Sequence, residues 1–143
     1  MDVYPAAFDA TIGLFMSDTA PPTALLVEDD ESIAFLLRFL LERMGCRVLS
    51  ARDGVEAMSA IESGEVTRLV LLDMMLPVHD GLTLLGKLRS LPRWDGVPVV
   101  MLTAKGEQGF IDRAFAAGAS DFVHKPFNPS ELMARLKPML ATA

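Results

Sequence analysis

Residues 69–73 read LVLLD, four apolar residues in a row that run directly into a carboxylate. A short, continuous apolar run is typical of a strand that is buried on both faces of a parallel sheet. Similar runs occupy residues 24–27 and 99–102, and a shorter one covers residues 122–124. The sequence therefore predicts an α/β protein with a buried parallel sheet.

A polar group stands at the end of each of these runs. The groups are, in chain order, Glu28 with Asp29, then Asp73, Thr103 and Lys125. Ligands of open α/β sheets bind at the carboxyl ends of the strands. We therefore expect these side chains to converge on one acidic pocket, although they come from widely separated parts of the chain.

Strands and helices alternate along the chain from Thr23 onward. This alternation predicts right-handed crossovers, with helices on both faces of the sheet. The expected helices cover about residues 31–44, 53–64, 82–90, 107–117 and from 129 onward, and a further strand covers residues 47–50.

The composition is that of a single globular domain. Its 143 residues are 51% hydrophobic, which excludes a disordered chain, and 22% charged with only short apolar runs, which excludes a membrane protein. The net charge of −6 argues against bulk attraction to nucleic acid. A lone cysteine, Cys46, and the lack of any basic residue before Arg38 favour a cytoplasmic location without a secretory signal.

Residues 1–22 differ from the rest of the chain. They contain no Lys or Arg and end in Pro21 and Pro22, which disfavour a helix. We interpret residues 1–22 as a flexible or loosely packed N-terminal extension and residues 23–141 as the domain. Met16 is an alternative natural start, and we expect residues 1–15 to be dispensable.

Three of the pocket residues are acids: Glu28, Asp29 and Asp73. Two carboxylates about 5 Å apart repel each other by roughly 3 kcal/mol at an effective dielectric constant near ~20. A cation offsets this repulsion, and Mg²⁺ suits a set of oxygen ligands. Lys125 adds a second, fixed positive charge. A carboxylate held beside these charges can attack phosphorus, so Asp73 is the candidate nucleophile.

Three neighbours complete the predicted chemistry. The hydroxyl of Thr103 could donate to a phosphoryl oxygen, and the small side chain of Ala104 leaves room for that group. The backbone carbonyl of Met75 could face the metal.

Each motif also has an ordinary interpretation. Asp29 and Asp30 are typical helix caps, and Asp73 or Thr103 could belong to turns at strand ends. Lys125 could be a solvated charge. All four motifs at the ends of four strands favour the shared pocket.

With these motifs, the chain from Thr23 to Leu140 resembles the receiver domain of two-component response regulators. The resemblance implies a flavodoxin-like, doubly wound sheet of five parallel strands in the order 2-1-3-4-5. The segments that carry it are Val27–Asp30, Leu72–Pro77, Asp80-Gly81, Leu102–Ala104, Ala117–Ala119 and Lys125–Phe127.

The resemblance also implies roles for the pocket residues. Asp73 would accept a phosphoryl group from a histidine kinase or histidine phosphotransfer protein, and Thr103 and Lys125 would contact the phosphoryl oxygens. In this family the Lys-Pro bond is usually cis. The implied ligands of Mg²⁺, directly or through water, are Glu28, Asp29, Asp73 and the carbonyl oxygen of Met75.

One position departs from the pattern of the family. Members often carry Tyr three residues before the Lys, where this chain has Phe122. Thr103 and Phe122 remain the expected switch pair, but Phe122 has no hydroxyl with which to make a new hydrogen bond. The alternative is that Phe122 only fills the core. We interpret His79 as a solvated loop residue and His124 as structural.

The expected function is that of a single-domain, chemotaxis-type response regulator. Its phosphorylation would switch contacts with an unknown downstream protein, without nucleic acid or membrane, and it would catalyse only its own phosphorylation and dephosphorylation. An aspartate-nucleophile phosphohydrolase is the alternative enzyme, but such hydrolases carry a second Asp where this chain has Met75. A pseudo-receiver that only binds partners is a third interpretation, against which the intact Asp73, Thr103 and Lys125 argue.

Two aromatic residues of the first expected helix fall on its outward side. On a helical wheel, Phe35 and Phe39 lie near Arg38 and Glu42, away from the apolar stripe. Exposed aromatic residues tend to mark interfaces, so we expect Phe35 and Phe39 to help dock the phosphodonor protein. The alternative is that Phe39 packs under a neighbouring loop or the extension.

Overall fold

The computed structural model describes residues 21–76, 78–104 and 108–141. These residues form five strands that alternate with five α-helices, and one short 3-10 helix. The strands are β1 (Thr23–Val27), β2 (Arg47–Ala51), β3 (Leu69–Asp73), β4 (Val99–Ala104) and β5 (Asp121–Lys125). The helices are α2 (Glu31–Arg43), α3 (Gly54–Ser63), α4 (Gly81–Ser90), α5 (Gln108–Ala116) and α6 (Pro129–Ala141), with the 3-10 helix η1 (Pro92–Trp94) after α4.

The strands form one parallel sheet in the order β2-β1-β3-β4-β5. This order confirms the flavodoxin-like, doubly wound fold predicted from the sequence. Every residue of the central strand β3 is buried. All the strands run in the same direction, so their carboxyl ends meet at one edge of the sheet.

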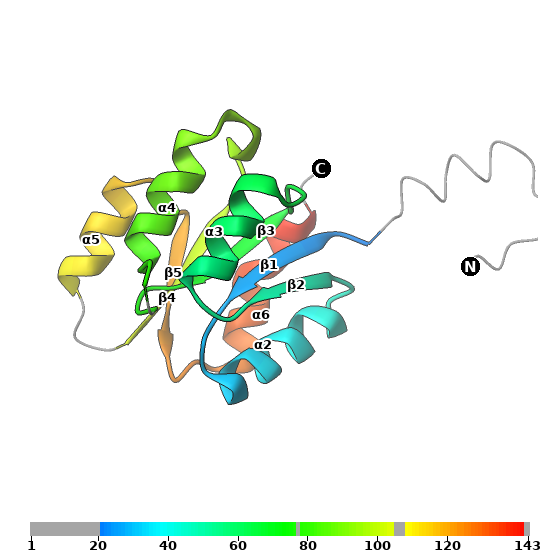
Figure 1. Cartoon of the computed structure of the whole chain (residues 1–143). Coiled ribbons are helices and arrows are strands. Elements are labelled where there is room, and N and C mark those ends of the chain that lie inside the picture. Colours follow the sequence, from blue (N-terminus) through cyan, green and yellow to red (C-terminus); the bar gives the residue numbers. More distant parts are fainter. Residues whose placement is uncertain (1–20, 77, 105–107, 142–143) are drawn as a thin grey trace, which may run out of the picture.

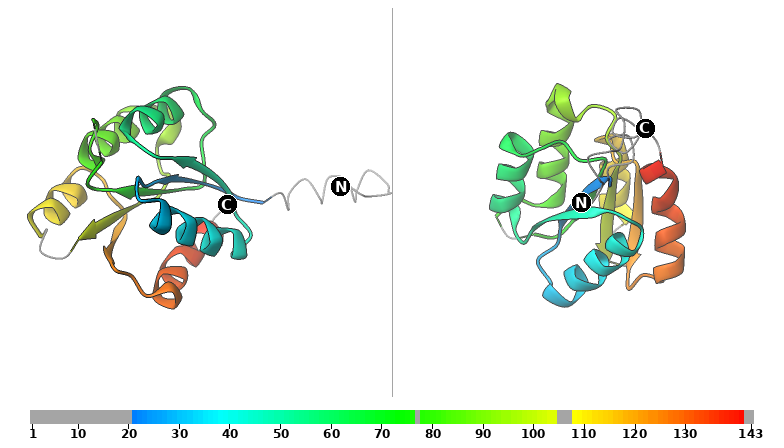
Figure 2. Two further views of the ribbon diagram at one scale, coloured as in Figure 1. Left: turned by 60° about the horizontal axis from the view of Figure 1, so that its bottom comes forward. Right: turned by 90° about the vertical axis from the view of Figure 1, so that its right-hand side faces the viewer.

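Helices cover both faces of the sheet (Figures 1 and 2). The helices α2 and α6 lie on one face, and α3, α4 and α5 lie on the other. Alternate residues of β3 divide between these layers: Leu69 and Leu71 pack with α2 and α6, whereas Val70 and Leu72 pack with α3 and α4. Because both faces are buried, the strand sequences are apolar throughout rather than alternating.

Short polar motifs fix where the helices begin and end. Asp30 accepts a hydrogen bond from the Ile33 amide at 2.9 Å and caps α2, so Asp29 is not the cap of this helix. Asp53 caps α3 in the same way. Gly45, which has a φ of 89°, follows the C-cap of α2 in the left-handed conformation that favours glycine.

The last two strands extend further than the sequence suggested. Thr103 and Ala104 are the final residues of β4, and Lys125 is the final residue of β5. These side chains therefore sit on strand positions rather than in the loops beyond. The expectations for the extension, including the dispensability of residues 1–15, lie outside the described residues. In the part of the chain that is described, no helix has both the length and the apolar character needed to cross a membrane.

The packing of α2 on the sheet can be tested with two adjacent leucines. Leu37→Ala should lower the free energy of unfolding by about 2–5 kcal/mol, because Leu37 is completely buried against the sheet. The same truncation at Leu36, which is 39% exposed, should cost less than about 1 kcal/mol. Urea unfolding of both variants measures the difference, and equal losses would contradict this placement of α2.

Candidate functional site

Three carboxylates meet at the carboxyl ends of β1 and β3. Glu28 and Asp29 follow β1, and Asp73 is the last residue of β3. One oxygen of each carboxylate lies within 4.8 Å of an oxygen of each of the others. Glu28 and Asp73 are buried, whereas Asp29 is exposed. The structure therefore contains the predicted acidic cluster, and one side of it is open to solvent.

The ammonium group of Lys125 lies between two of these carboxylates. Its Nζ atom is 2.8 Å from Oε1 of Glu28 and 3.1 Å from Oδ2 of Asp73. The peptide bond between Lys125 and Pro126 is cis. Residues from the ends of β1, β3 and β5 thus form one ionic cluster, because the carboxyl ends of the parallel strands meet at one edge of the sheet.

Burial and charge act against each other in this cluster. Burial raises the pKa of Glu28 from its ordinary 4.5 to about 7, although the hydrogen bond from Lys125 lowers it. Burial also lowers the pKa of Lys125, but the hydrogen bond to Glu28 and the charge of Asp73 outweigh it, so the pKa of Lys125 is raised overall. The ammonium is therefore charged, but it does not fully offset the cost of burying the Glu28 carboxylate.

The donor atoms of the pocket fit a divalent cation. Glu28, Asp29 and Asp73 supply the carboxylate oxygens that Mg²⁺ prefers, and the exposed side at Asp29 leaves room for the waters that Mg²⁺ usually keeps. Burial raises the pKa of Glu28, and a nearby cation would stabilise the ionised carboxylate against this effect. Met75, whose carbonyl is the predicted fourth ligand, donates its amide to Oδ1 of Asp73 at 3.2 Å.

A glycine holds the loop after Asp73 close to the start of α4. The amide of Gly81 donates to the carbonyl of Met74 at 2.9 Å. A Cβ atom at position 81 would lie only 2.5 Å from the carbonyl oxygen of Asp73 and 2.8 Å from Cα of Met74. Asp80 caps α4 by accepting a hydrogen bond from the Thr83 amide at 2.9 Å. The close approach at position 81 explains why glycine follows Asp80 in the motif.

Thr103 lies at the end of β4 with its side chain buried. Its hydroxyl oxygen is 3.0 Å from Nδ1 of His124, a contact that the sequence analysis missed. The two residues are direct partners in the register of β4 and β5. The contact could be predicted only from the register of the strands, because two residues this far apart in sequence form no local pattern.

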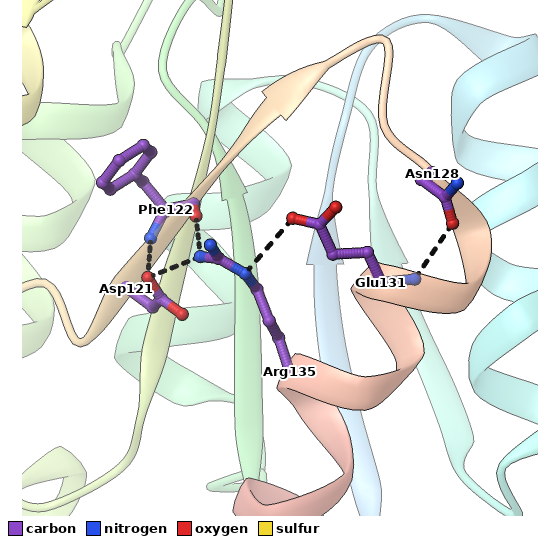
Figure 3. A network of polar contacts seen from close by, with 5 residues as sticks. All are labelled: Asp121, Phe122, Asn128, Glu131 and Arg135. Carbon is purple, nitrogen blue, oxygen red and sulfur yellow. Dashed lines mark hydrogen bonds and ion pairs between the residues drawn. The ribbon is translucent and has the colours of Figure 1, made fainter.

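Phe122 is half-buried on β5, and a polar network fixes the strand beside it (Figure 3). Arg135 of α6 donates to Oδ1 of Asp121 and to the carbonyl of Phe122, both at 2.9 Å. Asn128 caps the start of α6 by accepting from the Glu131 amide at 3.1 Å. The ring of Phe122 projects away from this network and packs against the layer that contains α4. Sequence reasoning missed Arg135, whose role depends on how α6 lies against β5.

The two outward aromatic residues of α2 are exposed, as the helical wheel predicted. Phe35 is 73% exposed and Phe39 is 47% exposed, with the guanidinium of Arg43 5.7 Å from the ring centre of Phe39. Phe35 also lines a shallow groove beside the acidic cluster, together with Glu28 and Asp29. An aromatic surface therefore adjoins the candidate site.

Comparisons with known proteins agree on the family of this chain. The model of the response regulator receiver domain matches residues 24–137. The phosphate regulon transcriptional regulatory protein PhoB of Rhizobium meliloti is 42% identical over 122 residues, which cover 85% of this chain and 53% of that protein. The chain spans about half the length of the curated relatives that it matches.

Solved structures show the same architecture. One is the receiver domain of a sensor histidine kinase from Pseudomonas aeruginosa, which has a magnesium ion coordinated in its active site cleft. Its TM-score is 0.77 at 31% identity, and the match covers 86% of this chain and 100% of that chain. The chemotaxis response regulator CheY4 of Vibrio cholerae has a TM-score of 0.77 and 28% identity, with 84% of this chain and 99% of that chain covered.

The raised pKa of Glu28 predicts how stability depends on pH. Between pH 4.5 and 7, Glu28 binds a proton more tightly in the folded protein than in the unfolded chain. Because of this residue, the free energy of unfolding should fall as the pH rises through that window. Glu28→Gln should remove this contribution, whereas the same change at Glu42, on the exposed side of α2, should leave it in place. Urea unfolding in the presence of a chelator measures the effect, and an unchanged slope in Glu28→Gln would refute it.

Proposed function

Because the chain belongs to the family of response regulator receiver domains, we propose that Asp73 accepts a phosphoryl group from a histidine kinase or a histidine phosphotransfer protein. The observation that carries this proposal is the cluster around Asp73: a buried carboxylate, 3.1 Å from the Lys125 ammonium and next to Glu28 and Asp29. The transfer would be Mg²⁺-dependent, and it would change the contacts that this protein makes with a downstream protein.

In the proposed transfer, a carboxylate oxygen of Asp73 forms a bond to phosphorus while the bond between phosphorus and the donor's imidazole nitrogen breaks. Lys125 and the hydroxyl of Thr103 would contact the phosphoryl oxygens and stabilise their charge. A Mg²⁺ ion held by Glu28, Asp29, Asp73 and the Met75 carbonyl, in part through water, would supply further positive charge. These residues position and neutralise the group, which is most of what phosphoryl transfer requires.

The pocket supports a signalling role better than the hydrolysis of external phosphoesters. The position two residues after Asp73, where an aspartate-nucleophile hydrolase carries its acid-base residue, holds Met75. We therefore propose that the protein catalyses only its own phosphorylation and dephosphorylation. Its net charge of −6 supports an output through protein contacts rather than direct binding of nucleic acid by this domain.

We propose that Phe35 and Phe39 form part of the docking surface for the phosphodonor protein. Both are exposed on α2, and Phe35 lines the groove next to Glu28 and Asp29. A partner that covers these rings would thereby approach the side of the pocket that is open at Asp29.

The phosphoacceptor can be identified with a small phosphodonor. In the presence of Mg²⁺ and acetyl phosphate, the wild-type protein should gain an acid-labile phosphate that Asp73→Asn lacks, because the variant has no carboxylate to attack phosphorus. Asp95→Asn, which alters an exposed loop residue, serves as the control and should react like the wild type. Lys125→Ala should still be phosphorylated but should no longer change conformation. Mass spectrometry under neutral conditions measures the modification, and labelling of Asp73→Asn at the wild-type rate would overturn the assignment.

The docking surface can be separated from the chemistry. The double variant Phe35→Ala with Phe39→Ala should lose at least about tenfold in transfer from a cognate kinase, because aromatic anchors of this kind dominate interfaces. Its reaction with acetyl phosphate should be unchanged. Val55→Ala, which truncates an apolar side chain that is 56% exposed on α3, provides the control. Equal losses with both donors would show that the two rings support the fold instead.

A further inference from the structure

The hydroxyl of Thr103 already has a partner in this structure. Its Oγ1 atom lies 3.0 Å from Nδ1 of His124, and the two residues face each other across β4 and β5. Thr103 is only 1% exposed, so solvent cannot readily replace this contact. The residue proposed to contact the phosphoryl group is therefore in contact with an imidazole in this structure.

A threonine hydroxyl carries a single proton to donate. When that proton is directed at Nδ1 of His124, it is not available to a phosphoryl oxygen on Asp73. In the tautomer that carries its proton on Nε2, Nδ1 is an acceptor, and Nδ1 and the phosphoryl group then compete for the same donor. A neutral hydrogen bond contributes about 0.5–1.5 kcal/mol, which corresponds to about a two- to tenfold change in an equilibrium constant.

We propose, on the basis of the function proposed above, that His124 is a positioning residue that holds the Thr103 hydroxyl in the resting protein. Phosphorylation of Asp73 draws the hydroxyl to the phosphoryl group and releases the imidazole. His124 thereby sets how readily the domain adopts its phosphorylated conformation, because the hydroxyl must leave one acceptor before it reaches the other.

Ring contacts connect this hydrogen bond to the surface of the protein. The rings of His124 and Phe122 meet edge to face with centres 5.2 Å apart, and Phe122 meets Phe115 of α5 in the same manner at 5.7 Å. Phe122 has no polar group with which to sense Thr103, but the imidazole next to it does. A change in the position of His124 would therefore alter the packing of Phe122 and, through it, of the partly exposed ring of Phe115.

Binding of beryllofluoride, a phosphoryl mimic, in the presence of Mg²⁺ tests the proposal. His124→Val removes the acceptor but keeps a side chain suited to a strand, and it should bind the mimic about two- to tenfold more tightly than the wild type. His124→Asn places an amide oxygen near the position of Nδ1 and should restore the wild-type affinity. His79→Asn, the same change at the other histidine, is the control and should have no effect. Unchanged or weaker binding by His124→Val would overturn the proposal.

Nuclear magnetic resonance of the imidazole nitrogens gives a second measurement on the intact protein. The chain has two histidines, so the His79→Asn variant assigns both sets of signals. The Nδ1 signal of His124 should shift when beryllofluoride and Mg²⁺ are added, toward the value found in Thr103→Val, in which the hydroxyl is absent. The signals of His79 should shift much less. A His124 signal that stays in place would overturn the proposal even if His124→Val failed to fold.

The two proposals fail in different ways. If the wild type does not bind beryllofluoride in an Asp73-dependent manner, the proposed phosphoacceptor function is wrong and the role of His124 falls with it. If the wild type binds the mimic but His124 neither shifts nor affects affinity, only the role of His124 is wrong.

Discussion

The candidate site depends on one ammonium group held between two buried carboxylates. Without Lys125, Glu28 and Asp73 would face each other in a largely desolvated pocket, where an uncompensated charge costs several kcal/mol (about 3–5 when a buried pair loses one partner). The parallel sheet makes the arrangement possible, because it brings the ends of β1, β3 and β5 to the same edge. The ammonium offsets the burial of Glu28 only in part, which leaves the pocket suited to a dication.

Most of the fold and the centre of the site could be predicted from the sequence because both depend on patterns along the chain. Continuous apolar runs indicated strands buried on both faces, and the polar residue at the end of each run indicated the pocket. The contact between Thr103 and His124 could not be predicted in this way, nor could the bonds from Arg135 to β5. Both depend on how side chains meet across elements, which requires the register of the strands and the position of α6.

The edge position of β5 links the site to the surface of the molecule. Among the described residues this strand pairs with β4 alone, and Arg135 of α6 hydrogen-bonds its first two residues, Asp121 and Phe122. Along the same strand, Lys125 contacts Asp73, His124 contacts Thr103, and Phe122 packs against the ring of His124. An edge strand has fewer neighbours to hold it than a central one, so a rearrangement of His124 on β5 meets less resistance than it would on β3.

The ionic cluster also has a consequence for folding during synthesis. Lys125 belongs to the last strand, whereas the acids that it neutralises follow the first strand and end the third. Chains are synthesised from the amino terminus, and early segments can collapse before later ones exist. Glu28 and Asp73 can therefore meet on the ribosome before Lys125 has been made. During that interval a proton on Glu28 or a cation from the surrounding solution would have to take the place of the Lys125 ammonium.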